Sequence, residues 1–206
     1  MVKIVMLENI RSMTCIHLEN GQKYWLNKED VISAGIDEGM EVNLDSFIET
    51  LRLYQYPKAL NTAVSMLARR ACSSSEIKKR LRIRHYTDDV ADLVIYKLEK
   101  ERLLNDEEFC MQWIQYRSSM HWGPSRIKLE LKYKGIPDSL IQEKMDLIDS
   151  ATQENNALIL AKKCWNKYRT SDNIQSCRQK VIQALVRKGF SWDSARDACR
   201  QAEKEE

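Results

Sequence analysis

Residues 77–87 read IKKRLRIRHYT, and the same pattern returns as IKLELKYKGIP at 127–137 and as VIQALVRKGFS at 181–191. Each copy places two apolar residues four positions apart, the spacing that puts side chains on one face of a helix. Histidine or glycine then follows, where the residue that ends a helix adopts the left-handed conformation. An apolar residue and a helix-starting residue complete each copy. The sequence therefore predicts an internal repeat built from helices.

The segments on either side of these copies are also helical in pattern. WIQYR at 113–117 matches WNKYR at 165–169, and the same register in the first copy gives Met66, Arg69 and Arg70. After the first copy, an apolar stripe recurs at the spacing of one helix face. The stripe consists of Val90, Leu93, Val94 and Leu98. Each unit is thus predicted as three helices, over about Lys58–Leu104, Asp106–Ser150 and Gln153–Ala202.

The first residues have a different pattern, typical of β-structure. Apolar runs at Val2–Leu7, Thr14–Glu19 and Gln22–Leu26 predict strands, and the last two flank Asn20-Gly21. Asn-Gly favours a tight hairpin in which both turn residues have positive φ. A short helix over Lys28–Ala34 and a loop through Gly39 are expected next.

The predicted fold is therefore mostly α. Three tandem three-helix repeats form an elongated, curved array with a concave face, after a small N-terminal segment that contains a β-hairpin. The predicted boundaries are residues 1–56 for this segment and 57–104, 105–150 and 151–206 for the repeats. Six glycines and three prolines in 206 residues agree with long helices.

Charge is distributed unevenly along the chain. Residues 1–50 hold nine acids and four bases, a net charge of −5, so the remaining 156 residues carry +8 of the total of +3. We call residues 1–50 the acidic head. The basic character of residues 51–206 suggests an anionic partner, of which nucleic acid is the usual one. A soluble surface with a chance imbalance is the alternative.

Sites for metals and for catalysis are not indicated. The six cysteines form no C-x-x-C pair and show no regular spacing, which suggests packed, reduced thiols in an intracellular protein. His17, His85 and His121 are grouped with neither a nucleophile nor a carboxylate pair, and no phosphate-binding glycine loop is present. We expect no enzyme, no cofactor and no metal. Since no signal-peptide or transmembrane pattern occurs, we expect a soluble protein.

Three segments resemble the RecX family. Arg70–Leu81 (RACSSSEIKKRL) resembles its first-repeat signature, and Leu104–Cys110 (LNDEEFC) is similar to its link into the second repeat. Trp122–Ile136 (WGPSRIKLELKYKGI) resembles the most distinctive segment of the family. Three motifs in this order and spacing are specific, whereas one alone is weak.

The resemblance is clear over residues 57–150, extends to 203 through the repeat, and is loose over 1–56. This sequence departs from the family at Cys110, where alanine is usual, and at His85, where glycine is common. Neither departure changes a charge that the function needs.

The resemblance implies a cytoplasmic regulator of RecA recombinase that acts in homologous recombination, DNA repair and the SOS response. Family members are expected to lie in the groove of the RecA–DNA filament and to suppress its ATPase, strand exchange and coprotease activities. The implied partners are the RecA filament and, weakly within it, single-stranded DNA. The family implies neither cofactor nor catalysis. A monomer is expected because no coiled-coil seam is visible.

Basic residues are the predicted partner contacts. Lys78 and Lys79 begin a basic run, Lys78 aligns with Lys128, and Arg82 aligns with Lys132. A basic column at one register would meet phosphates or acidic protein loops. Lys134, aligned with Arg84 and Lys188, lies in a last helical turn, where a cation also offsets the helix dipole. Arg117 and Arg126 are the remaining predicted partner contacts. For Arg117 and Arg169 two alternatives stay open: they contact a partner, or they pair with acids of the next helix.

Other residues are expected to be structural. Ser73 and Glu76 form a capping box, Asp106 opens the second repeat, and Gly135 ends a helix. Gly123-Pro124 opens a helix, and the alternative is that this bend presents Trp122 and Arg126 to a partner. Trp113 and Trp165 are expected in the core rather than stacked on bases.

Two other functions remain open. A direct nucleic-acid-binding module would bind DNA alone with a steep salt dependence. A generic helical scaffold would affect neither RecA nor DNA. The direction of the effect on RecA and the role of the acidic head also stay open.

Overall fold

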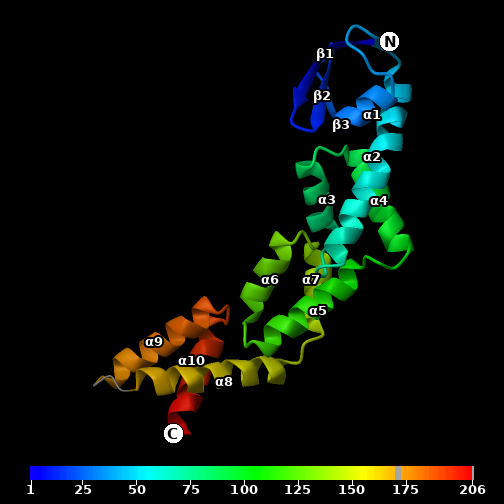
Figure 1. Ribbon diagram of the computed structural model, residues 1–206. Helices are drawn as coiled ribbons and strands as arrows, with labels where there is room; N and C mark the ends of the chain where they lie inside the picture. Colours follow the sequence, from blue (N-terminus) through cyan, green and yellow to red (C-terminus); the bar gives the residue numbers. More distant parts are fainter. Residues whose placement is uncertain (170–172, 206) are drawn as a thin grey trace. The chain divides into compact units, whose positions relative to one another are not determined.

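The computed structural model describes residues 1–169 and 173–205. Residues 170–172 and 206, which fall in the predicted third repeat, lie outside the described residues. The chain forms two compact units, Met1–Asn105 and Asp106–Glu206. Within the described residues, a four-stranded sheet in the first unit precedes helices that fill the rest of the chain (Figure 1). The predicted class, mostly helical with three three-helix repeats behind a β-containing segment, is confirmed.

The first unit begins with an antiparallel sheet in the order β3-β2-β1-β4. Because strand side chains alternate, Ile4, Ile16 and Leu26 share one face, where they are buried. Helix α1 and the start of α2 cover this face through Val31 and Phe47. The elements are β1 (Val2–Ile10), β2 (Met13–Leu18), β3 (Lys23–Asn27), α1 (Lys28–Ser33) and β4 (Glu41–Val42).

The turn between β2 and β3 lies at Asn20-Gly21 as predicted, but its predicted geometry is wrong. Of the two residues only Gly21 has a positive φ, +83°. The Leu18 amide donates to the Gln22 carbonyl at 2.9 Å, so the loop is longer than two residues. The Asn20 side chain instead accepts from the Gln22 amide at 3.0 Å. Strand β4 was not predicted, because two residues show no alternation.

Helix α2 (Leu44–Leu67) connects the sheet to the first repeat. It is continuous over 24 residues with Pro57 inside it, so it begins well before the predicted first helix at Lys58. Asn43 caps it by accepting from the amides of Asp45 and Ser46 at 3.0 and 3.2 Å. Its first half buries Leu51 against the sheet, and its second half buries Ala63 in the repeat core.

Helices α3 (Ser74–Ile83) and α4 (Asp88–Lys100) complete the first repeat. Ile77 and Leu81 are fully buried, as expected for the pair that defines the repeat. Of the apolar stripe predicted on α4, Val90, Val94 and Leu98 are buried, but Leu93 is 39% exposed. The prediction that Leu93 belongs to the core stripe is wrong, because α2 and α3 cover a narrower face of α4 than the pattern suggested.

The second unit contains the other two repeats. The second comprises α5 (Asp106–Ser119), α6 (Pro124–Tyr133) and α7 (Asp138–Asp146). The third comprises α8 (Ser150–Tyr168), α9 (Ile174–Arg187) and α10 (Trp192–Lys204). Each has its own buried cluster, around Ile127 and Leu131 in one and around Val181 and Leu185 in the other.

The end of the second helix is the same in all three repeats. His85, Gly135 and Gly189 have φ values of +63°, +75° and +96°, the left-handed conformation that the sequence predicted. The next amide returns to the helix each time; for example, Tyr86 N donates to Leu81 O at 3.2 Å. These are Schellman ends, which satisfy carbonyls that the helix leaves without a partner. Histidine adopts this conformation more readily than most residues, and its ring stacks on Trp25, with 4.2 Å between ring centroids.

Gly123 and Gly189 join the two repeats of the second unit. The Gly123 amide donates to Lys188 O at 2.8 Å, and Ser125 N donates to Gly189 O at 3.1 Å. The carbonyls of the two residues that follow α9 therefore accept from backbone amides at the start of α6. A Cβ on Gly123 would overlap the backbone of Gly189 and Phe190. Both glycines are thus required by a close approach of two backbones.

Candidate partner-binding surface

The predicted basic column of the first repeat lies on α3 and faces α4. Lys78 pairs with Asp92, and Arg82 Nε lies 2.6 Å from Asp88 Oδ1. The hydrogen bond from Arg82 lowers the pKa of the Asp88 carboxyl and raises the pKa of Arg82 itself. Both side chains of this pair are more than half exposed.

The second repeat reproduces this arrangement between α6 and α7. Lys128 Nζ donates to Gln142 Oε1 at 2.8 Å, and Lys132 Nζ lies 2.9 Å from an oxygen of Asp138. The structure therefore places the four predicted contacts at matching registers, but each is engaged with the third helix of its own repeat.

In the third repeat the same register is apolar. Ile182 and Val186 replace the two cations, and Trp192 replaces the acid that would pair with the second one. Val186 and Trp192 are exposed. The basic column therefore belongs to the first two repeats alone. Because exposed ion pairs contribute little to stability, an external anion can compete for these cations.

Arg117 lies in an internal cluster rather than on an open surface. Its Nε lies 2.7 Å from Glu130 Oε2, and the two side chains are 20% and 15% exposed. Its guanidinium lies 4.7 Å from the centroid of Trp113 and 5.1 Å from that of Trp122. The ion pair with the next helix is one of the two alternatives that the sequence left open. This environment favours a structural role.

Arg126 and Lys134 lie against aromatic rings of the second unit. Arg126 is 5.5 Å from the centroid of Trp122, and Lys134 Nζ is 4.0 Å from that of Trp113. Lys188 of the third repeat also lies over Trp122, with its Nζ 4.0 Å from the ring centroid. Trp122 is thus held by cations of its own chain.

Lys79 differs from the other predicted contacts. It is exposed on α3, and within the described residues it takes part in no ion pair or side-chain hydrogen bond. It is therefore directly available to an anionic partner.

The predicted structural residues lie at helix ends. Ser73 Oγ accepts from the Glu76 amide at 3.1 Å, and Glu76 accepts from the Ser73 amide at 3.2 Å, the reciprocal geometry of a capping box. Glu76 also receives two hydrogen bonds from Arg70. Asp106 is the first residue of α5, and Gly123 precedes Pro124 at the start of α6.

An apolar groove between α2 and α4 was missed by the sequence analysis. It encloses about 610 Å³ and contains Leu53, Leu93 and Tyr96, all exposed. Arg52, Lys97 and Lys100 also line it, with Glu49 as the one acid among its described lining residues. The sequence did contain a signal for this groove. Leu93 and Tyr96 are three residues apart and form a second apolar row on α4, but Leu93 was assigned to the row predicted to face the core.

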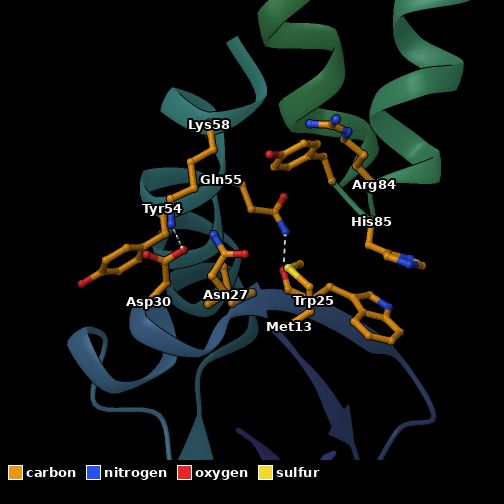
Figure 2. A pocket seen from close by; sticks show the side chains of 11 residues that line it. Met13, Trp25, Asn27, Asp30, Tyr54, Gln55, Lys58, Arg84 and His85 are labelled. Carbon is orange, nitrogen blue, oxygen red and sulfur yellow. Dashed lines mark hydrogen bonds and ion pairs between the residues drawn. The ribbon is translucent and has the colours of Figure 1, made fainter. Parts of the chain in front are cut away.

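A smaller pocket of about 260 Å³ lies where the sheet meets the first repeat (Figure 2). Buried Gln55 reaches from α2 to donate to Trp25 O at 2.7 Å, and it accepts from the Thr87 amide at 2.9 Å. Lys58 forms an ion pair with Asp30 on the opposite side. These contacts fix the acidic head to the first repeat.

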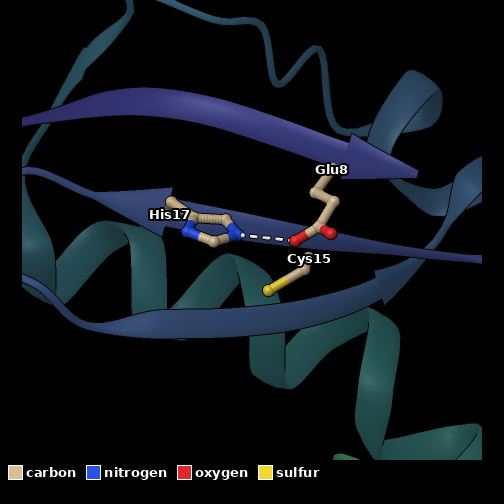
Figure 3. A group of neighbouring side chains, drawn as sticks. All are labelled: Glu8, Cys15 and His17. Carbon is tan, nitrogen blue, oxygen red and sulfur yellow. Dashed lines mark hydrogen bonds and ion pairs between the residues drawn. The ribbon is translucent and has the colours of Figure 1, made fainter. Parts of the chain in front are cut away.

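The sheet also brings together Glu8, Cys15 and His17 (Figure 3). Their ligand atoms lie within 4.8 Å of one another, and His17 Nε2 is 3.2 Å from Glu8 Oε2. Burial raises the pKa of the Cys15 thiol. In this group the His17–Glu8 contact is the one polar interaction between the side chains drawn.

Among the described helices, none combines the length and the apolar character that crossing a bilayer requires. The fold and the surfaces define a class: a tandem three-helix-repeat protein with a β-sheet head and charged helix faces.

Family models identify each repeat separately. Residues 59–98 match "RecX, first three-helix domain", residues 105–145 match the second and residues 152–199 match the third. The chain belongs to the RecX family.

Relatives and solved structures agree along most of the chain. It is 24% identical to "Regulatory protein RecX" of Streptococcus sanguinis strain SK36, over 100% of this chain and 79% of that protein. It is 27% identical to the protein of the same name from Bacillus cytotoxicus, over 93% of this chain and 72% of the relative. The crystal structure of RecX from Lactobacillus salivarius superimposes with a TM-score of 0.66 at 26% identity, covering 73% of this chain and 97% of that one. A second crystal structure, of a regulatory protein RecX, shares the fold with a TM-score of 0.65 at 22% identity, over 98% of this chain and all of that one.

Proposed function

We propose that this protein regulates RecA recombinase. It binds as a monomer in the groove of the RecA–DNA filament and suppresses ATP hydrolysis, strand exchange and coprotease activity, without catalysing a reaction itself. The cytoplasm is where it would meet this partner.

One observation carries this proposal: all three RecX three-helix domains are present, in order, in a single chain. Tandem repeats give a binding surface that lengthens with each repeat. A protein that spans several filament subunits restrains the motions between them. Cooperative ATP turnover and strand exchange depend on those motions, so one bound copy would slow several subunits.

The surfaces of the chain suit a protein partner. The groove between α2 and α4 offers exposed Leu53 and Tyr96 for burial, with Lys97 and Lys100 beside them. Exposed aromatic residues next to cations are typical of protein interfaces. We propose that an acidic, partly apolar segment of a RecA subunit lies in this groove. The basic column of α3 and α6 would contact acidic RecA loops or DNA phosphates.

Charge reversal on α6 tests the contribution of the basic column. The double variant Lys128→Glu/Lys132→Glu should lose most of its inhibition of RecA strand exchange. The control is Asp138→Asn, which breaks the pair with Lys132 but keeps the basic face. It should inhibit like the unmodified protein. If the double variant inhibits normally, or if Asp138→Asn fails equally, the contact face has been assigned wrongly.

A direct DNA-binding module is the second candidate function. The +8 charge of residues 51–206 favours it. It predicts tight, salt-sensitive binding to DNA in the absence of RecA, with no effect on RecA beyond competition for DNA.

A further inference from the structure

A basic pocket in the first repeat is not part of the predicted contact surface. It lies between α2 and α3 and has a volume of about 250 Å³. Its lining residues are Asn61, Thr62, Ser65, Met66, Arg69, Arg80 and Arg84. All three arginines are exposed, so the pocket is open to solvent.

The positive charge of this pocket is not neutralised within the described chain. None of its described lining residues is acidic, and Arg69 and Arg80 take part in no ion pair there. Arg84 donates to the neutral hydroxyl of Thr62 at 3.2 Å. Helices α2 and α3 end nearby, and each helix end carries a partial charge of only about −0.5. Three guanidinium groups therefore leave the pocket clearly positive.

The equivalent place in the second repeat is filled by side chains of the chain itself. In its register Phe109 replaces Thr62, Trp113 replaces Met66 and Glu130 replaces Arg80. Lys134, which replaces Arg84, lies over both aromatic rings. Glu130 pairs with Arg117 and accepts from Trp113 at 3.2 Å. The second repeat fills the space with rings and supplies its own acid.

The first repeat lacks both the filling and the acid. Thr62 and Met66 are smaller or more flexible than the rings of the second repeat and leave the pocket unfilled, and Arg80 occupies the position of Glu130. In the third repeat the place of Arg80 is taken by Ala184 and that of Met66 by the buried Trp165, so the arginine cluster is confined to the first repeat.

We propose that this pocket binds a phosphodiester group of a nucleic-acid strand. Guanidinium groups match the oxygens of phosphate in pairs, and Ser65 and Asn61 add neutral donors. Thr62 donates its hydroxyl to the Lys58 carbonyl and holds Arg84 at the edge of the pocket. A phosphodiester has two anionic oxygens, and each can accept hydrogen bonds from more than one guanidinium group, so the three arginines can share one phosphate. Because the pocket is open, it admits one phosphate of a continuous strand. This inference deepens the proposed function by placing the DNA contact in the first repeat.

The test measures DNA binding by the full chain without RecA, so that its failure is separate from failure of RecA regulation. Fluorescence anisotropy of labelled oligothymidine is followed as salt is raised, for the unmodified protein and for Arg80→Gln, Arg80→Glu and Arg102→Gln. Arg102 is exposed in the same repeat, outside the pocket, and removing it changes the net charge as Arg80→Gln does.

Arg80→Glu restores the acid found in the second repeat and should weaken binding by about tenfold. Arg80→Gln should reduce the slope of log K against log salt by at most about 0.7, the value for one phosphate of a single strand, because Arg69 and Arg84 remain in the pocket. Arg102→Gln should bind within about twofold of the unmodified protein. Circular dichroism should show all variants folded, since Arg80 makes no ion pair within the described chain.

Three results would overturn the proposal. The first is no binding of oligothymidine by the unmodified protein at low salt. The second is an equal loss in Arg102→Gln and Arg80→Gln, which would indicate a general charge effect. The third is displacement of the DNA by hexaglutamate, or by micromolar inorganic phosphate, because the site would then serve a protein acid or free phosphate.

Discussion

Gly189 shows how a single residue holds two repeats together. It has a φ of +96°, and a Cβ there would lie 2.5 Å from the amide nitrogen of Arg126. Gly189→Ala should therefore strain the backbone and push α6 away from α9. We expect a loss of about 2–4 kcal/mol in the free energy of unfolding, measured by urea denaturation.

Gly21 provides the matched control for this prediction. Its φ is similarly positive, +83°, but a Cβ at that position would have no neighbouring atom within 4 Å. Gly21→Ala should cost only the conformational strain, about 1 kcal/mol. Equal losses in the two variants would show that the close approach between α6 and α9 contributes nothing.

The thiol of Cys199 is expected to make the stability of the protein depend on pH. Burial raises the pKa of its thiol from 9.0 to about 11. Above pH 9 the unfolded chain loses this proton and the folded chain does not, so stability falls as pH rises from 9 to 11. The contribution is up to about 2–3 kcal/mol. Below pH 9 the thiol keeps its proton in both the folded and the unfolded chain, so it no longer makes stability depend on pH.

Comparison with Cys199→Ala isolates this effect from the titration of lysines and tyrosines. Urea midpoints are measured at a pH of about 8 and again at about 10.5, on either side of the unfolded thiol's pKa. The midpoint should fall further for the unmodified protein than for the variant. Identical falls would mean that the thiol ionises in the folded protein as it does in the unfolded one.

At the scale of elements, Gln55 joins three of them. Its side chain, 3% exposed, bridges the Trp25 carbonyl of β3 and the Thr87 amide before α4. Gln55→Leu would leave both of these partly buried backbone groups without their partner, at a cost of about 1–3 kcal/mol. Hydrogen exchange at the Thr87 amide should accelerate accordingly.

An exposed glutamine supplies the comparison. Gln112 of α5 bonds to Glu108 on the helix surface, so Gln112→Leu should change stability by less than about 0.5 kcal/mol. If Gln55→Leu is equally harmless, the acidic head is not fixed to the first repeat by this side chain.

The helical elements were predictable because local signals repeat. The left-handed residues at 85, 135 and 189 set the register of all three second helices, and capping residues set their starts. Strand β4 and the true start of α2 were not predictable. A two-residue strand has no period, and the helix continues through Pro57, which in a sequence suggests a boundary.

The candidate site was predicted only in part. The matching registers of Lys78 and Lys128 were visible, but their pairing to α4 and α7 depends on how the third helix packs. Arg80 stood in the basic run without being distinguished from it. The signal that separates it is the acid Glu130 at the equivalent position, which gains its meaning once its pairing with Arg117 is known.

At the scale of the whole molecule, two units carry three repeats with different surfaces. The first repeat offers the arginine pocket and the apolar groove, the second places Glu130 and aromatic rings where the first has the pocket, and the third exposes Val186 and Trp192. Under the proposed function, such differences would let the three repeats contact different parts of the RecA filament rather than the same part three times.

The most direct test of RecA regulation is the single-strand-DNA-stimulated ATPase of RecA, with this protein titrated in. DNA is first coated fully with RecA, and circular dichroism verifies that the added protein is folded. The account predicts a fall in ATP turnover well below one copy per RecA, because one chain acts on several subunits. An unchanged rate up to equimolar protein would contradict it and favour a scaffold with another partner.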